Sequence, residues 1–259
     1  MTNAVFLGSI LPPLFFGSRI SISFTELISL FRMNMSDLDW KKVEVIRRYI
    51  DLKNVLHILK EEILDPRGNL SEKELDEALV NRDGLPEYLF DYLDTYDTKE
   101  EQIRHFSSVF VQFFKDPEQQ LGEFLQFYLN FEREWRLILA AFRAKKLHLD
   151  LTKELQYEDF TDPMVVELLA RKEGDQFEFP YGYEELGVLL KSLGGNPLEQ
   201  YQRIAEFRFH QIEEKIQDTP HSIQFVLGYL IQFMIVEDWN ALNEKQGNTL
   251  LTTLYLERG

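Results

Sequence analysis

Residues 130–146 read NFEREWRLILAAFRAKK and, together with the residues before them, give the clearest indication of the fold. Apolar side chains recur there at steps of three and four, which is the spacing of one face of an α-helix. Asp116 and Pro117 precede this pattern as a cap and a first helical residue. We therefore predict one long helix from Pro117 to Lys146, with a stripe that comprises Leu121, Leu125, Tyr128, Leu129, Glu132, Trp135, Leu139 and Phe142.

Most of the remaining chain shows the same helical spacing. A long helix is predicted over residues 36–64, because Ser36 can cap it and Asp65-Pro66-Arg67-Gly68 ends the pattern. Another long helix is predicted from Pro220 to Leu242, and shorter ones are predicted over residues 71–80, 85–96, 103–114, 163–170 and 198–216. No convincing alternation of apolar and polar residues indicates a strand. We therefore predict an all-α fold with about ten helices.

Composition excludes several classes of protein. The chain has 259 residues, of which 44% are hydrophobic and 28% charged, so global disorder is excluded. It has no cysteine, which excludes disulfides, thiolate metal sites and a cysteine nucleophile. The formal net charge of −16 is the opposite of what a nucleic-acid-binding surface needs, and it should also repel anionic lipid.

The first 35 residues differ from the rest. Residues 4–24 are apolar, but Pro12, Pro13 and Arg19 interrupt them, so a membrane-spanning helix and a secretory signal are both disfavoured. We expect residues 1–35 to be an extended segment that packs on the core of a cytoplasmic protein. Residues 36–259 are expected to form a single helical domain with approximate units 36–97, 98–175 and 184–259, and residues 173–183 are the best linker candidate.

Three long helices share a local pattern in which an acidic residue interrupts an apolar run. The pattern occurs in residues 49–60, 130–146 and 233–245, about 80–105 residues apart. Its members are Asp51 with Asn54, Glu132 with Trp135 and Arg136, and Glu237 with Trp239 and Asn240. It predicts three related helical units. Unrelated amphipathic helices would also produce some such matches.

Charge is unevenly distributed along the chain. Residues 61–101 hold 14 acidic and 4 basic residues, whereas residues 41–48 and 133–146 are basic. Such blocks are either solvated faces or surfaces for a partner of opposite charge.

Catalytic patterns are weak. The sequence contains no P-loop, GxSxG or HExxH pattern, and its five histidines are scattered. Asp91, Asp94 and Asp97 could belong to a divalent-metal site, although a solvated helix has the same spacing. Glu132 and Arg136 are placed for a helix ion pair, which would favour a specific arrangement or interface if it were buried. We expect no catalytic site, cofactor or metal.

The sequence resembles two related families. The stretch IDLKNVLHILK followed by NLSEKEL looks like part of the C-type rotor component of V-type ATPases (called d in eukaryotes), and FEREWRLILAAFRAKKLHLDL fits the second unit of that family. The whole chain is more closely similar to a family of uncharacterised proteins encoded in bacterial V-type ATPase operons. That similarity includes SILPPLFFG with SFTEL, LGGNPLEQYQRIAEFRFHQIEE and GYLIQFMIVEDWNAL.

The resemblance to the C-type component implies a non-catalytic rotor part. Such a component is a funnel of helices on the membrane proteolipid ring; it receives the tip of the axle, built from the D and F components, and passes torque during proton or sodium transport. This chain would then be cytoplasmic and peripheral on the inner membrane. The residues expected near the inner wall of the funnel are Asp51, Asn54, Glu132, Arg136, Arg143 and Glu237.

This sequence departs from the family pattern in three respects. It is shorter than a typical C-type component, His57 and Ile58 stand where the first unit usually has an arginine, and its Pro-Pro segment is atypical. Two alternatives therefore remain open. One is a helical adaptor or assembly factor for the same complex, and the other is an enzyme with a metal site at Asp91, Asp94 and Asp97.

Overall fold

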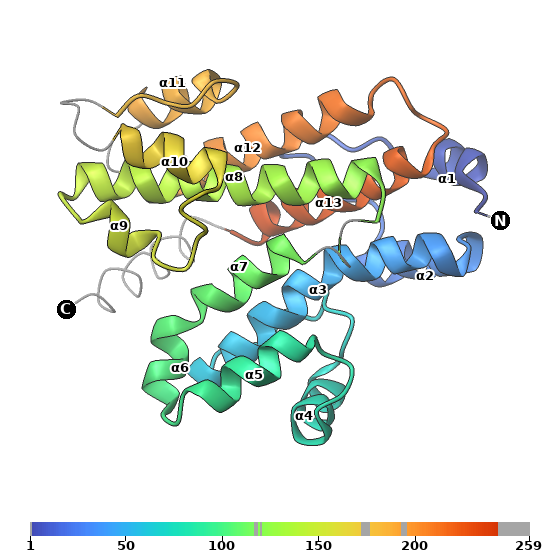
Figure 1. Cartoon of the computed structure of the whole chain (residues 1–259). Coiled ribbons are helices and arrows are strands. Elements are labelled where there is room, and N and C mark those ends of the chain that lie inside the picture. The colour runs from blue at the N-terminus through green and yellow to red at the C-terminus, as the bar shows by residue number, and fades with distance from the viewer. Residues whose placement is uncertain (1, 117–118, 120, 172–176, 193–195, 243–259) are drawn as a thin grey trace. The chain divides into compact units, whose positions relative to one another are not determined.

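The computed structural model describes residues 2–116, 119, 121–171, 177–192 and 196–242, and these residues form helices and connecting turns without a strand (Figure 1). The prediction of an all-α fold is confirmed. The helices of the described residues are α1 (Ala4–Ile10), α2 (Phe24–Asn34), α3 (Asp37–Lys60), α4 (Glu72–Asn81), α5 (Glu87–Thr95), α6 (Lys99–His105), α7 (Ser107–Lys115), α8 (Glu123–Lys146), α9 (Leu151–Glu154), α10 (Pro163–Ala170), α11 (Glu184–Ser192), α12 (Pro197–Ile216) and α13 (Ile223–Ala241).

Contacts group the chain into two compact units. The terminal unit combines the residues up to Trp40 with those from Glu178 onward, and the central unit is Lys41–Phe177. This grouping does not follow the three sequential units expected from the sequence, because the N-terminal segment packs with the C-terminal helices. The boundary at residue 177 falls inside the predicted linker. The three-unit funnel remains a prediction.

The terminal unit is built around α13. Every residue from Val226 to Val236 is buried, so this helix is covered on all sides. It packs against α12 at Gly228, where an added Cβ would lie 2.6 Å from a methyl group of Ile216. Only a residue without a side chain allows the two backbones to approach this closely. Helix α1 packs on α13 as well.

The central unit is built from α3–α10, with the part of α3 from Lys41 onward. Helix α8 contacts α7, α9 and α10, while α5 packs on α7. The most deeply buried side chains come from several of these helices and include Leu52, Leu75, Leu89, Phe106, Phe113 and Leu125.

Local capping signals placed several helices correctly. Ser71 and Glu74 form the predicted capping box in front of α4. Asp162 and Asn196 accept hydrogen bonds from the first backbone amides of α10 and α12, and a proline follows each of them. The long helix predicted over residues 36–64 is α3.

Three predicted helices differ in the structure. Helix α8 begins at Glu123 instead of Pro117, because Gly122 has a left-handed backbone (φ 95°) that a helix cannot continue through; Pro117 itself lies outside the described residues. The helix predicted over residues 103–114 is divided at Phe106 into α6 and α7. Helix α13 begins at Ile223 rather than Pro220, since the extended Ser222 caps it.

The N-terminal segment also differs from the expected extended chain. Asn3 caps α1, and a capping box of Ser23 and Glu26 begins α2. Between these helices the chain is irregular around Pro12 and Pro13. Leu7, Leu27 and Phe31 are fully buried, so the segment does pack on the core.

None of the helices in the described ranges is long and apolar enough to cross a membrane.

Candidate functional site

Asp51 and Asn54, on α3, are buried and bonded to the loop that follows their own helix. Asp51 Oδ2 accepts a hydrogen bond from Asn69 Nδ2 at 2.8 Å, and its Oδ1 accepts one from the backbone amide of Leu70 at 3.1 Å. The side chain of Asn54 both donates to the carbonyl of Asp65 and accepts from its amide, at 2.9 Å each. The two side chains therefore fix the 65–70 loop onto α3.

A third residue of α3, Arg47, also holds this loop. Arg47 donates from Nε to the carbonyl of Arg67 at 2.9 Å and from Nη2 to the carbonyl of Gly68. Gly68 lies so close to the Asp51 carboxylate that an added Cβ would overlap Oδ1. Burial raises the pKa of Asp51 above its usual range, and the hydrogen bonds from Leu70 and Asn69 offset only part of that effect.

Glu132 and Arg136 form the predicted ion pair on α8. Arg136 Nη2 donates to Glu132 Oε2 at 2.7 Å, and the carboxylate side chain is only 4% exposed. The guanidinium lies 4.9 Å from the ring centroid of Tyr49 and 4.8 Å from that of Trp135. Although desolvation acts to lower the pKa of Arg136, Tyr49 and Glu132 outweigh it and the pKa is raised.

Tyr49 in turn lies in an aromatic cluster. Its ring centroid is 5.2 Å from that of Phe110, 5.6 Å from that of Phe113 and 5.7 Å from that of Phe114. Arg136 therefore joins α8 to α3 at a point where α7 also packs.

The other two predicted residues lie elsewhere. Arg143 is exposed in the last turn of α8. Glu237 is half-buried on α13 and belongs to the terminal unit. The structure thus pairs Glu132 with Arg136 and ties Asp51 and Asn54 to one loop. A position for these residues near the inner wall of a funnel remains a prediction.

Residues of the third sequence pattern hold the N-terminal segment. The ring of Trp239 stacks on Phe16 with a centroid distance of 6.0 Å, and Tyr201 stacks on it at 6.5 Å. Asn240 Nδ2 donates to the carbonyl of Ser18 at 2.9 Å. The contacts of Trp239 and Asn240 with the N-terminal segment give these two residues a role in packing.

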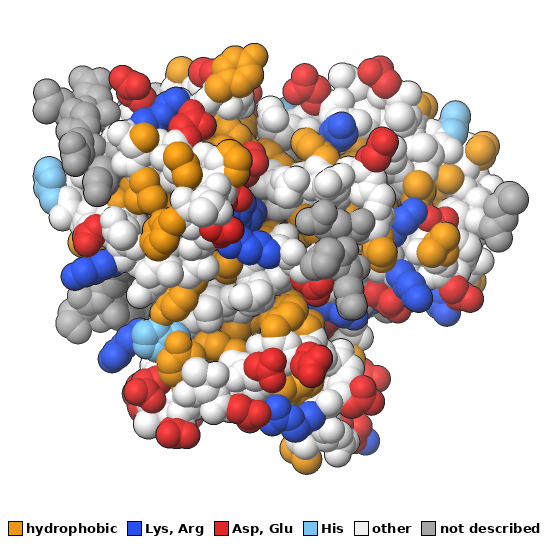
Figure 2. Space-filling model, in the orientation of Figure 1, with side chains coloured by type: hydrophobic (Ala, Val, Ile, Leu, Met, Phe, Trp, Pro, Cys, Tyr) orange, Lys and Arg blue, Asp and Glu red, His pale blue; other side chains and the backbone are white. Residues whose placement is uncertain are grey.

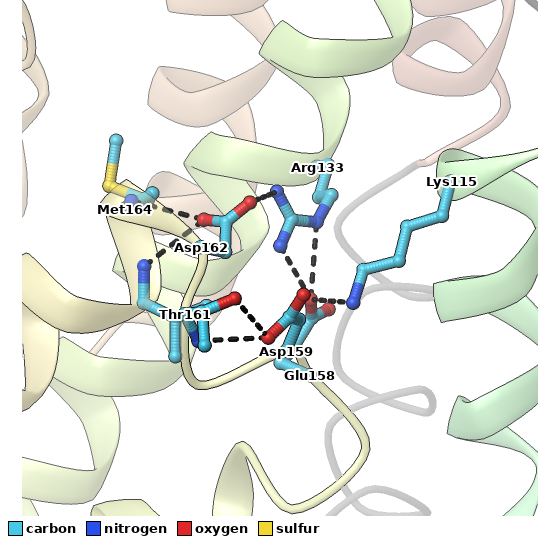
Figure 3. A network of polar contacts seen from close by, with 8 residues as sticks. Lys115, Arg133, Glu158, Asp159, Thr161, Asp162 and Met164 are labelled. Atoms are coloured by element: carbon cyan, nitrogen blue, oxygen red, sulfur yellow. Dashed lines mark hydrogen bonds and ion pairs between the residues drawn. The ribbon is translucent and has the colours of Figure 1, made fainter. Parts of the chain in front are cut away.

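A charged network centred on Arg133 was not predicted from the sequence (Figure 3). Arg133 donates to Glu158 Oε2 from Nη2 at 2.6 Å and from Nε at 3.2 Å, and to Asp162 Oδ2 from Nη1 at 3.0 Å. Lys115 Nζ lies 3.7 Å from the same Glu158 oxygen. The network links α7, α8 and the segment before α10. No sequence spacing pairs residue 133 with residue 158, so only the fold reveals it.

Asp94, one of the three aspartates considered for a metal site, is paired with Arg82. Arg82 forms two hydrogen bonds to the Asp94 carboxylate, at 2.9 and 2.7 Å. Asp91 and Asp97 are exposed. Within the described residues, no group of three His, Asp or Glu side chains is arranged to hold a metal ion.

The acidic block of the sequence forms an exposed surface over α4, α5, α6 and the turns beside them, which we call the acidic surface (residues 61–101). Figure 2 shows carboxylates gathered on this part of the central unit. All of its acidic residues except Asp65 are exposed. Its four cations already have acidic partners inside the block, in the pairs Arg67–Asp65, Lys73–Glu77, Arg82–Asp94 and Lys99–Glu61. Fourteen acids less four cations leave a net charge of −10 on the surface.

Comparison with known proteins gives a family and distant relatives. A family model described as a protein of unknown function (DUF2764) matches residues 1–255. An uncharacterized protein of Chlamydia trachomatis serovar D is 27% identical over 260 residues, with 98% of each chain covered. Similar proteins of Chlamydia muridarum and Chlamydia pneumoniae are 26% and 25% identical, with 98% and 97% of each chain covered. No solved structure matches the chain.

Proposed function

We propose that this chain, which belongs to the DUF2764 family of proteins of unknown function, is a non-catalytic structural component of a V-type ATPase. In this proposal it joins the central axle, formed by the D and F components, to the proteolipid ring during proton or sodium transport. It is then cytoplasmic and peripheral on the inner membrane through the complex. The resemblance of its long helices to the C-type component supplies the identity of the complex.

The acidic surface is the observation on which this proposal depends. Because its cations are already engaged inside the block, its remaining carboxylates are left to attract a cationic partner. Complementary charge speeds encounter and fixes orientation more than it adds affinity. A basic axle tip is a partner of that kind.

The interior polar residues support a rigid body. Asp51, Asn54 and Glu132 are buried and hydrogen-bonded within the central unit. Buried polar groups that are hydrogen-bonded to one another favour one arrangement of their helices over alternatives. A protein that transmits torque needs such a fixed arrangement.

The proposal is tested by binding to purified V-type ATPase parts from the source organism of the chain. The acidic variant carries Glu72→Gln, Asp76→Asn, Asp97→Asn and Glu100→Gln on the acidic surface. A control variant carries Glu184→Gln, Glu185→Gln, Glu214→Gln and Asp218→Asn, which removes the same charge from exposed positions of the terminal unit. We expect wild type and the control variant to bind the D–F axle at low salt and the acidic variant to bind at least 10-fold more weakly.

Binding to the proteolipid ring is measured in the same way with detergent-solubilised rings. The rotor proposal requires the wild-type chain to bind both the axle and the ring. Failure to bind one of them would exclude it. Equal axle binding by the two variants would show that the acidic surface is not the contact.

A helical adaptor or assembly factor for the same complex is the second candidate. The grouping of the helices into two units, one of them discontinuous, favours it over a regular three-unit funnel. An adaptor of this kind would bind the soluble ATP-hydrolysing head and leave the complex after assembly. Binding to the isolated head without binding to the ring would support this candidate.

A further inference from the structure

The turn between α8 and α9 exposes apolar side chains next to cationic ones (Figure 1). Leu147 and Leu149 are 52% and 47% exposed, and every residue from Lys146 to Asp150 is exposed. We call residues 143–154 the α8–α9 tip. Exposed apolar side chains that are clustered, unlike those that occur singly, indicate a binding surface.

The backbone fixes the position of the two leucines. The amide of Leu149 donates to the carbonyl of Ala144 at 2.8 Å, which closes the end of α8. His148 has a left-handed backbone (φ 55°), and the side chain of Asp150 then caps α9. The leucines are therefore held at the surface before any partner arrives, so binding through them costs little additional ordering.

The charge of the α8–α9 tip is opposite to that of the chain. The tip contains four basic and two acidic residues, in a chain with 28 basic and 44 acidic residues. Lys146 directly precedes Leu147, Lys153 lies on α9, and both lysines are exposed. Exposed charges more than about 8 Å apart are largely screened at physiological ionic strength, so a partner at the tip responds mainly to these local charges. The net charge of −16 therefore does not exclude an anionic partner here.

We propose that the α8–α9 tip is a contact with an anionic lipid surface. A bilayer that contains anionic lipid offers negative headgroups with hydrocarbon directly beneath them, which fits leucines flanked by lysines. A lysine side chain can also extend along apolar surface while its amino group reaches a headgroup. This contact does not depend on the proposed role in a V-type ATPase.

The size of the apolar part favours lipid over a protein partner. Each side of a standard protein interface buries about 800 Å², far more than two half-exposed leucines offer. A lipid surface needs no matching shape, so a few apolar and basic side chains are enough for a weak contact that is sensitive to salt.

Co-sedimentation of the full chain with lipid vesicles tests this proposal. We expect binding to phosphatidylcholine vesicles that contain about 30% phosphatidylserine, and binding about 10-fold weaker to phosphatidylcholine alone. Raising salt from about 0.1 to 0.5 M should abolish binding. The double variant Leu147→Ser with Leu149→Ser should weaken it about 10-fold, and Lys146→Gln with Lys153→Gln should weaken it by a similar factor.

Matched substitutions elsewhere on the central unit serve as controls. Ile63→Ser with Val80→Ser removes apolar side chains that are 95% and 82% exposed. Lys41→Gln with Lys60→Gln removes two exposed cations. Both control variants should bind vesicles as wild type does, and circular dichroism checks that every variant is folded.

A dye at the α8–α9 tip provides a second measurement. Because the chain has no cysteine, Leu149→Cys supplies a single thiol for an environment-sensitive dye. Its fluorescence should rise and shift to the blue when anionic vesicles are added, since the dye enters an apolar layer. The same dye on Ile63→Cys should not respond.

Three outcomes would overturn the proposal. The first is no binding of wild type to the anionic vesicles, and the second is equal weakening by the tip variants and the control variants. The third is binding that the lysine substitutions weaken and the leucine substitutions do not, because a purely electrostatic surface would fit an acidic protein equally well.

Discussion

The guanidinium of Arg136 lies over the ring of Tyr49, with 4.9 Å between its carbon and the ring centroid, and also donates a hydrogen bond to buried Glu132. One side chain thus connects two long helices and compensates a buried carboxylate. The cost of losing it depends mainly on Glu132, because an unpaired buried charge costs far more than a lost surface contact.

Arg136→Gln should therefore lower the free energy of unfolding by about 3 kcal/mol, because the charge of Glu132, whose side chain is 4% exposed, would stay buried without its partner. The double variant Arg136→Gln with Glu132→Gln should recover more than half of that loss, because no buried charge remains. Urea unfolding of the two variants and wild type gives the comparison. Equal losses in the single and double variants would mean that the Glu132 charge is not what Arg136 compensates.

Gly68→Ala should destabilise the protein by about 2–3 kcal/mol, since the new methyl group would overlap the Asp51 carboxylate. The same substitution in an Asp51→Ala background should cost less than about 1 kcal/mol, because the overlapping oxygen is gone. Thermal and urea unfolding of the four proteins form a double-mutant cycle. Additive effects of the two substitutions would contradict the close contact.

The raised pKa of Asp51 predicts that the stability of the protein depends on pH. Burial raises its pKa in the folded protein, so between the unfolded pKa of about 3.9 and the folded value the native state binds the proton more tightly. Stability contributed by this group is therefore complete below that window and decreases as pH rises through it. Asp51→Asn lacks the titration, so the stability of wild type relative to this variant should decline as pH rises above about 4. Urea unfolding at a series of pH values measures the difference, and an increase instead would contradict the raised pKa.

The charged network should depend unequally on its two cations. Arg133 is 11% exposed and makes three hydrogen bonds, so Arg133→Leu should cost about 3 kcal/mol by leaving Glu158 buried and poorly compensated. Lys115 is 33% exposed and 3.7 Å from Glu158, so Lys115→Ala should cost less than about 1 kcal/mol. Unfolding measurements on wild type and the two variants compare these two losses in the free energy of unfolding. Similar costs for the two substitutions would contradict the central position of Arg133.

The sequence by itself determined the all-α class and those helix starts that depend on a few neighbouring residues. Asp162 with Pro163, Asn196 with Pro197, and Ser71 with Glu74 act over two or three positions, so their effect is readable before folding. The ion pair of Glu132 and Arg136 could also be predicted, because one turn of helix separates the two residues.

Only the tertiary structure decided which partners the polar residues of these helices contact. Arg133 meets Glu158 and Asp51 meets Asn69 across turns whose paths no local pattern fixes. The division at Phe106 has a similar origin, since this buried ring packs edge-on against Tyr92 on another helix. Long-range packing outweighs local helical preference at such positions, because burying a large side chain is worth more than continuing one turn of helix.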